Sequence, residues 1–512
     1  MVQQKQSSLP PKRTKNNKSK KHTRAPETVE EYQEAADFQE STGGKWRAGD
    51  PVKSCRAFLR AVEIYDAGLA RFATDFDLAY NKARLQLEIT QQQPALVVNL
   101  PVSLLEYLRQ TLDSHRYVLQ LNEEVPDALY NTAQVLTVLA EQLADGDNPG
   151  AKDEAIMFLR QALEYCSSCL SRQETLLEEQ IKALQGSQSQ DQLPAYTVDS
   201  MTGAFSGTEL QLSASDSDSN YATVERAVAP SDLLDTSRAA LSAMTTLISL
   251  ASATDIATLS SMAKDIERKI STYQAILTIP DSEETRIEVA LERTEFDAAL
   301  AEAEFRFGTI STQTYLNRLH AFSTIPQESP TVLCSQAEAL ISFVVAVIQT
   351  QPRSQLAGTC WGPLTRAESL YSNAAALIQR STSSSITSNN HDRARLFIAQ
   401  GDLELLRVRV ASSPNDISLT QNLPVLLEHA MKYYLGAVRF VSAPRVGITE
   451  EAEGKAVLVE IMQALQVGKE VSQTSTSARN KALRALRDLV GEEMVEREIA
   501  DAIEKSFGGA KT

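Results

Sequence analysis

The chain is poor in the residues that mark secreted and membrane-spanning proteins. It has 5 cysteines in 512 residues, an odd and scattered set that gives no disulfide framework, so reduced thiols are expected. The longest uninterrupted apolar stretches, such as Phe343–Ile348, are far shorter than the ~20 residues that cross a bilayer. The N-terminus has no apolar leader. We therefore expect an intracellular protein without a membrane segment.

Motifs for catalysis and metal binding are also missing. The five histidines, His22, His115, His320, His391 and His429, form no ligand motif. Cys166 and Cys169 have CxxC spacing but no second pair, whereas a structural metal needs about four ligands. The Gly-Gly-Lys at 43–45 is not a phosphate loop, because Gln39 and Trp46 stand where a glycine and a hydroxyl residue are required. No nucleophile elbow or dinucleotide fingerprint occurs. We predict that the protein is not an enzyme and has no metal or cofactor.

Charge is unevenly distributed along the chain. Residues 1–26 hold eight lysines or arginines and no acid, which leaves 42 basic against 66 acidic residues over 27–512, a net charge of about −24. An acidic body of this kind repels nucleic-acid phosphates and attracts basic partners. We expect a basic protein client and no direct nucleic-acid binding by the body.

The basic N-terminal segment has almost no large apolar side chains, so residues 1–26 are predicted to be disordered. Its cations match a nuclear import signal. They are Lys12, Arg13, Lys15, Lys18, Lys20, Lys21 and Arg24. A non-specific RNA contact and a simple solvated tail are the alternatives. On the first interpretation the protein is both cytoplasmic and nuclear.

The body shows helical periodicity. Leu59, Val62, Tyr65, Leu69 and Phe72 form an apolar stripe at three- and four-residue steps. Prolines, which are tolerated in the first helical turn and between helices, fall at the predicted joints. They are Pro51, Pro101, Pro126, Pro149, Pro230, Pro280, Pro330, Pro363 and Pro424. Because no convincing alternating strand occurs, the predicted fold class is all-α.

One long segment interrupts the helical pattern. Residues 186–228 are rich in Ser, Gln and Asp and lack sustained periodicity, which predicts a disordered linker. The expected organisation is a basic tail, an N-terminal helical array at 27–185, this linker, and a larger helical array at 229–507. Within the linker, Ser213 and Ser215 each have an acid three residues later and are candidate phosphorylation sites.

A phrase that occurs twice indicates the kind of helical fold. Tyr80-Asn81-Lys82-Ala83 and Tyr130-Asn131-Thr132-Ala133 each lie early in a helical run, fifty residues apart. A repeated helix-opening phrase is typical of helical repeats, in which each unit buries its apolar face against its neighbours. The alternative is an ordinary helical bundle in which the phrase recurs by chance.

The small and aromatic residues resemble those of the tetratricopeptide repeat, a unit of two antiparallel helices and about 34 residues. Its second helix carries a small residue, an aromatic and a further small residue. Three segments fit: Ala430, Tyr434 and Ala437; Ala155, Phe158 and Ala162; Ala61, Tyr65 and Gly68. The segments 399–402 and 307–309 resemble the turn between the two helices.

This resemblance implies a tetratricopeptide-like α-solenoid with degenerate repeats. It is best over residues 45–180. Repeat spacing is irregular, with extra residues at 91–100 and 145–150. The family's Leu-Gly pair is replaced by Lys82-Ala83 and Thr132-Ala133, and its tryptophan is missing.

The resemblance also implies a peptide-binding site. Asn81 and Asn131 stand where peptide-binding members place an Asn on the concave surface, since an amide both donates to and accepts from a peptide backbone. Tyr80 and Tyr130 are included in this candidate site, chiefly as packing residues. Alternatively, the asparagines contact the neighbouring helix or water. A basic clamp of the kind that binds heat-shock protein termini is disfavoured, because Lys82 and Arg84 are replaced by Thr132 and Gln134 in the second copy.

An acidic stripe provides a second candidate surface. Glu284, Glu288, Glu292 and Glu295 share one helical face, where like charges cost about 0.2–0.5 kcal/mol per pair. The stripe either serves a basic partner or is a solvated face relieved by the nearby Arg286 and Arg293.

Together these features favour an escort or assembly chaperone that holds a basic client segment, such as a ribosomal protein in ribosome biogenesis or a histone. The alternative is a scaffold subunit of a multiprotein complex. The sequence leaves the oligomeric state open.

Overall fold

A computed structural model describes most of the chain outside the basic tail and the predicted linker. The described residues are 25–47, 49–91, 94–97, 99–144, 150–187, 227–276, 282–380, 386–412, 417–440, 446–468 and 475–508. Every regular element within these ranges is a helix, which confirms the all-α prediction.

The helices follow one another in pairs from the N-terminus to the C-terminus. In the first half they are α1 (Val29–Trp46), α2 (Pro51–Leu69), α3 (Phe76–Gln91), α4 (Pro94–Val97), α5 (Leu104–Leu121), α6 (Pro126–Ala144), α7 (Ala151–Ser187), α8 (Pro230–Leu250), α9 (Ala253–Ile276) and α10 (Ser282–Arg306). In the second half they are α11 (Thr312–Leu319), the 3₁₀ helix η3 (His320–Thr324), α12 (Pro330–Thr350), α13 (Arg353–Arg380), α14 (Ile386–Ala411), α15 (Ile417–Thr420), α16 (Leu423–Phe440), α17 (Val446–Gln466), α18 (Thr476–Gly491) and α19 (Arg497–Gly508).

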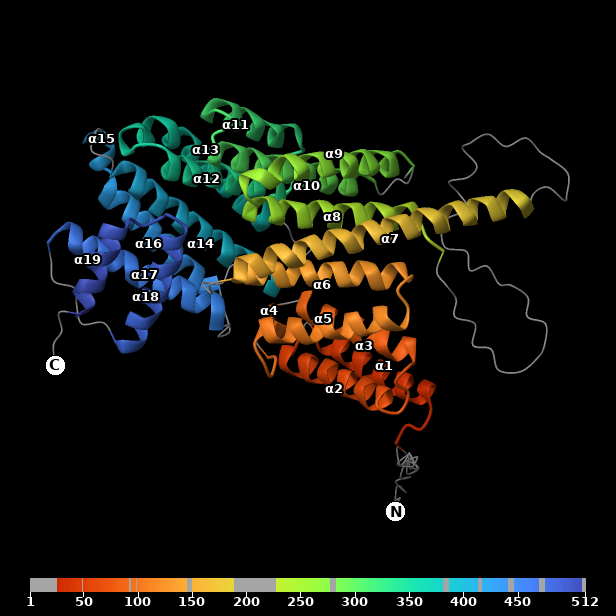
Figure 1. Cartoon of the computed structure of the whole chain (residues 1–512). Coiled ribbons are helices and arrows are strands. Elements are labelled where there is room, and N and C mark those ends of the chain that lie inside the picture. Colours follow the sequence, from red (N-terminus) through yellow and green to blue (C-terminus); the bar gives the residue numbers. More distant parts are fainter. Residues whose placement is uncertain are drawn as a thin grey trace, which may run out of the picture.

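Packing follows the order of a solenoid. The pairs α1/α2, α3/α5, α6/α7, α12/α13, α14/α16 and α17/α18 pack as hairpins, and the second helix of a pair contacts the first helix of the next, as in α2/α3, α5/α6, α7/α8, α13/α14 and α16/α17. Figure 1 shows the resulting stack, which rises from α1 to α10 and then bends so that α14–α19 descend beside it. Each pair is thus covered by its neighbours, as expected for helical repeats.

The helices begin where the sequence predicts. Asp50 caps α2 by accepting a hydrogen bond from the Lys53 amide at 3.0 Å, and Pro51 opens the helix. Pro126, Pro230 and Pro330 likewise open α6, α8 and α12. These residues confirm the predicted proline positions at helix starts.

Pro363 is an exception, because it lies inside α13 and not at a joint. A proline within a helix removes one backbone hydrogen bond and crowds the preceding turn. Cys360, Leu364 and Ala367, all buried, pack on both sides of it, so tertiary contacts continue the helix past the proline.

The small residues predicted to let helices approach closely are buried. Four of these positions are buried: Tyr65 and Gly68 of α2, Ala83 of α3 and Ala133 of α6. A Cβ atom on Gly68 would lie 3.1 Å from side-chain atoms of both Leu78 and Tyr32, so these helices have room for little more than hydrogen at that point. Small residues at these positions therefore let neighbouring helices approach closely.

One of the two predicted turns is wrong. Residues 399–402 lie in the middle of α14, where a Cβ atom on Gly401 would meet the Tyr434 ring of α16 at 2.5 Å. The glycine leaves room for the Tyr434 ring to pack against α14, and the chain does not turn at this point. The other predicted turn is correct, since Gly308 has φ +73° between α10 and α11.

Helix α12 alone among the described residues is long and apolar enough, by length and composition, to cross a membrane. It is also a central helix of the stack, packed against α10, α11 and α13 with Phe343, Val344 and Val347 fully buried. Its apolar composition is accounted for by this position in the core.

The described helices on either side of residues 188–226 share one hydrophobic core. Leu139 and Leu163 of the preceding helices lie in the same buried cluster as Leu241 and Ile248 of α8. The solenoid therefore continues directly from α7 to α8.

Candidate interaction surface

The two copies of the repeated phrase lie on neighbouring first helices, α3 and α6. The Asn131 amide donates a hydrogen bond to the Tyr80 hydroxyl at 3.4 Å, and the Phe76 ring stacks on Tyr80 with 5.9 Å between centroids. Tyr80 is thus a packing residue, and Asn131 touches the preceding repeat. Asn81 and Tyr130 are half-buried on the same two helices. A role for these four residues in peptide binding stays a prediction.

Polar contacts join successive first helices along one side of the stack. Arg84 of α3 binds Glu40 of α1 at 2.7 Å, and the Gln91 amide of α3 donates to the Gln134 carbonyl of α6 at 2.7 Å. We call the side formed by α1, α3, α6, α8, α10 and α12 the first-helix face. Each of these helices contacts the next one on this face, α1 and α3 through the Arg84–Glu40 pair and the others through helix packing.

The two cations beside the first phrase are held in ion pairs. The Lys82 ammonium lies 2.7 Å from the Asp66 carboxylate. Arg84 bridges Glu40 and Glu88, and the bound carboxylates raise the pKa of its guanidinium against the effect of burial. This arrangement agrees with the sequence argument against a basic clamp.

The acidic stripe of α10 meets a cation from another helix. Arg238 of α8 forms a forked pair with Glu292, at 2.9 Å from Nε and 2.7 Å from Nη2, and a second bond to Glu288 at 3.0 Å. Two-point geometry of this kind is the strongest arrangement between a guanidinium and a carboxylate. These contacts raise the pKa of Arg238.

Two carboxylates next to this pair have no cation. The pKa of Glu295 on α10 is raised by burial and by the charge of Glu292, although the Ser335 hydroxyl partly offsets this. The pKa of Glu338 on α12 is raised by partial desolvation of its carboxylate and by the charge of Glu295, although part of the residue is exposed to solvent. Within the described ranges neither residue forms an ion pair.

A fifth carboxylate completes the group. Burial is the main cause of the raised pKa of Asp235 on α8, and the neighbouring Asp232, Glu292 and Glu288 add to it, whereas Arg238 opposes it. We define the acidic patch as Asp235, Glu288, Glu292, Glu295 and Glu338, which lie on α8, α10 and α12. The first three contact Arg238, Glu295 lies near Glu292, and Glu338 lies near Glu295. Burial is the main cause of the raised pKa values of Asp235, Glu295 and Glu338, and a neighbouring carboxylate adds to each, so an incoming cation is favoured here.

Sequence reasoning found only part of this patch. The three- and four-residue spacing located Glu288, Glu292 and Glu295. Nothing in the sequence connects Glu292 with Arg238, 54 residues away, or Glu295 with Glu338, 43 residues away. Their proximity follows from the order in which the helices stack.

Other predicted features are buried or undescribed. Cys166 and Cys169 are buried, and burial raises the pKa of Cys166 to about 12, as expected for a packing thiol. No group of His, Cys, Asp or Glu among the described residues is arranged to hold a metal ion. The import residues Lys12 to Arg24 and the phosphorylation candidates Ser213 and Ser215 lie outside the described residues.

The helix order and contacts define an all-α helical-repeat protein, a class that offers long surfaces to other proteins.

Comparison with known proteins adds one sequence relative. No protein-family model matches the chain. The chain is 35% identical over 162 residues to UPF0656 protein C926.02 of Schizosaccharomyces pombe, a match that covers 32% of this chain and 34% of the relative. The match thus spans about a third of the relative's length.

Two solved structures resemble the chain along most of its length, but only loosely. The match to a circular tandem repeat protein with novel repeat topology covers 93% of this chain and 94% of that protein's chain, at 12% identity and a TM-score of 0.28. The match to yeast Tom70 covers 92% of this chain and 99% of the Tom70 chain, at 12% identity and a TM-score of 0.16. At such scores neither likeness carries an argument, so the fold assignment rests on this chain's own helices.

Proposed function

We propose that the protein is an escort or assembly chaperone that holds an extended basic segment of a client on its first-helix face, with the acidic patch as the principal contact. The finer classification as a tetratricopeptide-like repeat is part of this proposal. It is supported by the buried small and aromatic residues of the three matching segments.

The observation that carries the proposal is the state of Glu295 and Glu338. The pKa of each is raised mainly by burial and further by a neighbouring carboxylate, Glu292 for Glu295 and Glu295 for Glu338, and neither forms an ion pair within the described residues. A lysine or arginine bound between them would relieve this repulsion and restore ordinary ionisation. The client-bound protein is therefore favoured over the free protein at this patch, because a cationic client removes the repulsion.

The remaining charge supports a long basic client. Residues 27–512 carry a net charge of about −24, so a polycationic segment is attracted from a distance and its own charges are screened when bound. A ribosomal protein or a histone has this chemistry, so the proposed client is one of these and the proposed process is ribosome biogenesis or histone escort. Import by the N-terminal basic cluster would let it work in both cytoplasm and nucleus.

The test is purification of the tagged full chain from its own cells, with stepwise elution by salt and identification of each fraction by mass spectrometry. We expect one dominant basic protein that elutes at moderate salt, since exposed charge pairs are screened over about 10 Å at 0.1 M. The variant Glu295→Gln/Glu338→Gln should lose this basic protein. A matched control, Glu178→Gln/Glu179→Gln, removes the same charge from exposed positions of α7 and should retain it.

The scaffold alternative gives the opposite pattern. Several partners that resist salt and are retained by Glu295→Gln/Glu338→Gln would contradict the escort proposal and support a scaffold with apolar interfaces. A dominant acidic partner would contradict both.

A further inference from the structure

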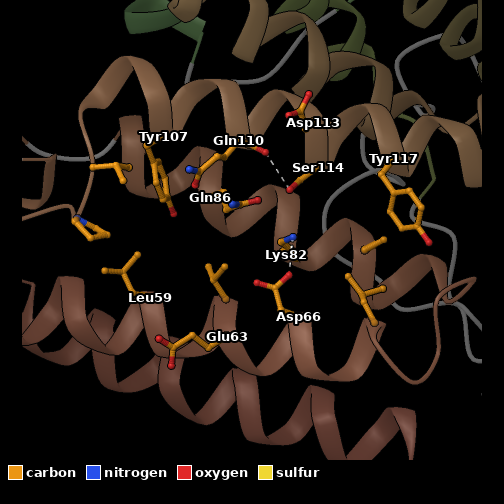
Figure 2. Close-up of a pocket in the computed structure, with 15 residues that line it drawn as sticks. Leu59, Glu63, Asp66, Lys82, Gln86, Tyr107, Gln110, Asp113, Ser114 and Tyr117 are labelled. Carbon is orange, nitrogen blue, oxygen red and sulfur yellow. Dashed lines mark hydrogen bonds and ion pairs between the residues drawn. The ribbon is translucent and has the colours of Figure 1, made fainter.

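A groove of about 640 Å³ separates the second helices α2 and α5, with α3 as its floor (Figure 2). It lies apart from the first-helix face. Ala79, Lys82 and Gln86 line the groove and recur at three- and four-residue spacing, so they share one side of α3. Tyr80 and Arg84, which belong to the first-helix face, are turned away from that side by the same helical geometry.

Two buried polar side chains point into the groove without a partner. Tyr107 is 3% exposed and Gln86 is 4% exposed, and neither the Tyr107 hydroxyl nor the Gln86 carbonyl oxygen has a hydrogen-bond partner. Figure 2 shows both side chains in the space between α2 and α5. Buried polar groups are normally satisfied, because leaving them unpaired is costly. Both atoms can accept a hydrogen bond from an N–H group of a ligand.

The rim of the groove is acidic. Glu63 and Asp66 of α2 and Asp113 of α5 line it, and the single lining ammonium, Lys82, is already paired with Asp66 at 2.7 Å. Leu59 of α2 adds an apolar wall. Carboxylates above an apolar wall suit a lysine or arginine, whose aliphatic stem packs on the wall while its charged head stays at the rim.

The chain itself supplies a segment of this chemistry beside the groove. Residues 1–24 hold eight cations and no acid. The segment joins the described structure at Pro26, whose carbonyl accepts a hydrogen bond from Arg71 at 3.0 Å, just beyond the end of α2. Tyr117, which lines the groove, donates to the Ala73 carbonyl in the same turn.

We propose that the groove between α2, α3 and α5 binds the chain's own basic N-terminal segment, residues 1–24. Fully extended, 24 residues reach about 80 Å, so the segment can reach any part of the groove. A tether this short gives an effective concentration in the millimolar range, which makes even weak docking substantial. While docked, the cations predicted to form a nuclear import signal are covered, so occupation of the groove would control their display.

The test is site-specific photocrosslinking in the full chain, with no client present. Gln110, an exposed residue that lines the groove, is replaced by p-benzoylphenylalanine and the purified protein is irradiated. Because residues 1–26 contain no acid, cleavage after glutamate releases residues 1–27 as one fragment. We expect mass spectrometry to find this fragment attached to the peptide that contains position 110.

Two controls make the result specific. The same probe at Leu435, which is 45% exposed on α16, should not capture residues 1–27. Charge reversal at the rim, Glu63→Lys/Asp113→Lys, should lower the yield roughly fivefold or more, whereas Asp501→Lys/Glu504→Lys, an equal change at exposed positions of α19, should leave it unchanged.

Three outcomes overturn the proposal: attachment to residues 188–226, no attachment from position 110, or a yield that both reversals lower equally. A mixture of ¹⁵N-labelled and unlabelled chains separates attachment within one molecule from attachment between two, and the latter would assign the groove to a second copy. Since no client is used, the result is independent of the proposed escort function.

Discussion

The Asn131 amide donates a hydrogen bond to the Tyr80 hydroxyl, so the second copy of the repeated phrase contacts the first copy 51 residues earlier. The two helices that open with this phrase are stacked in register, which places the same position of each repeat on the same face. The contact is 3.4 Å long, at the weak end of hydrogen bonding.

The variants Tyr80→Phe and Asn131→Ala separate packing from client binding. Tyr80→Phe removes the contact but keeps both asparagines, so it should lower the free energy of unfolding by less than about 1 kcal/mol and retain the client. The double variant Asn81→Ala/Asn131→Ala should lose the client. Urea unfolding and client co-purification are the two measurements. Equal loss of client in Tyr80→Phe would show that the amides act only through packing.

Neutralising the uncompensated carboxylates should stabilise the free protein. Their raised pKa values mean that the charged forms are disfavoured in the folded state, so Glu295→Gln and Glu338→Gln should each raise the free energy of unfolding by roughly 0.2–1 kcal/mol at pH 7. Chemical unfolding at low salt measures this. Glu178→Gln, at an exposed site, is the reference, and a loss of stability in the patch variants would contradict the account of the patch.

Arg238 should be essential to the folded patch. Its replacement by alanine leaves Glu288 and Glu292 without their cation, and the expected loss is about 1–3 kcal/mol. Arg238→Lys keeps the charge but cannot form the fork with Glu292, so its effect should lie between wild type and alanine. Unfolding midpoints of the three proteins rank them, and a lysine variant as unstable as alanine would indicate that geometry outweighs charge.

A buried ion pair in the C-terminal array gives a larger effect. Lys455 of α17 is 4% exposed and lies 2.9 Å from Asp402 of α14, which also accepts a hydrogen bond from Tyr434 at 2.7 Å. Lys455→Met strands the carboxylate and should cost about 3–5 kcal/mol. The double variant Asp402→Asn/Lys455→Met should recover part of this loss. If it recovers none, the pair is not the source of the effect.

Client affinity should fall as the solution is made acidic. The pKa values of Glu295 and Glu338 are raised above the ordinary 4.5, so these groups take up protons at a higher pH than exposed glutamates do. A bound cation favours the charged forms, hence binding weakens as pH falls through the raised pKa values, by roughly fivefold for each lost charge pair of about 1 kcal/mol. Titration calorimetry at several pH values measures this, and Glu295→Gln/Glu338→Gln should flatten the dependence.

The sequence by itself determined the elements and the local packing code. Apolar spacing and the prolines at 51, 126, 230 and 330 gave the helices and their starts, because helix periodicity and capping are local properties. Small residues such as Gly68 and Ala83 marked the points of close approach. The acidic stripe on α10 was likewise visible from its four-residue spacing.

Only the tertiary structure decided which distant groups meet. Arg238 and Glu338 join the stripe of α10 because α8, α10 and α12 are stacked neighbours, and no local pattern encodes a contact over tens of residues. Gly401, read from the sequence as a turn, lies within a helix because the Tyr434 ring fills the space beside it. Pro363 was assigned to a joint for the same reason, since its place inside α13 depends on the packing of the buried Cys360, Leu364 and Ala367 in a core shared with other helices. Local chemistry fixes where helices form, but charge pairing and close packing depend on neighbours that folding alone supplies.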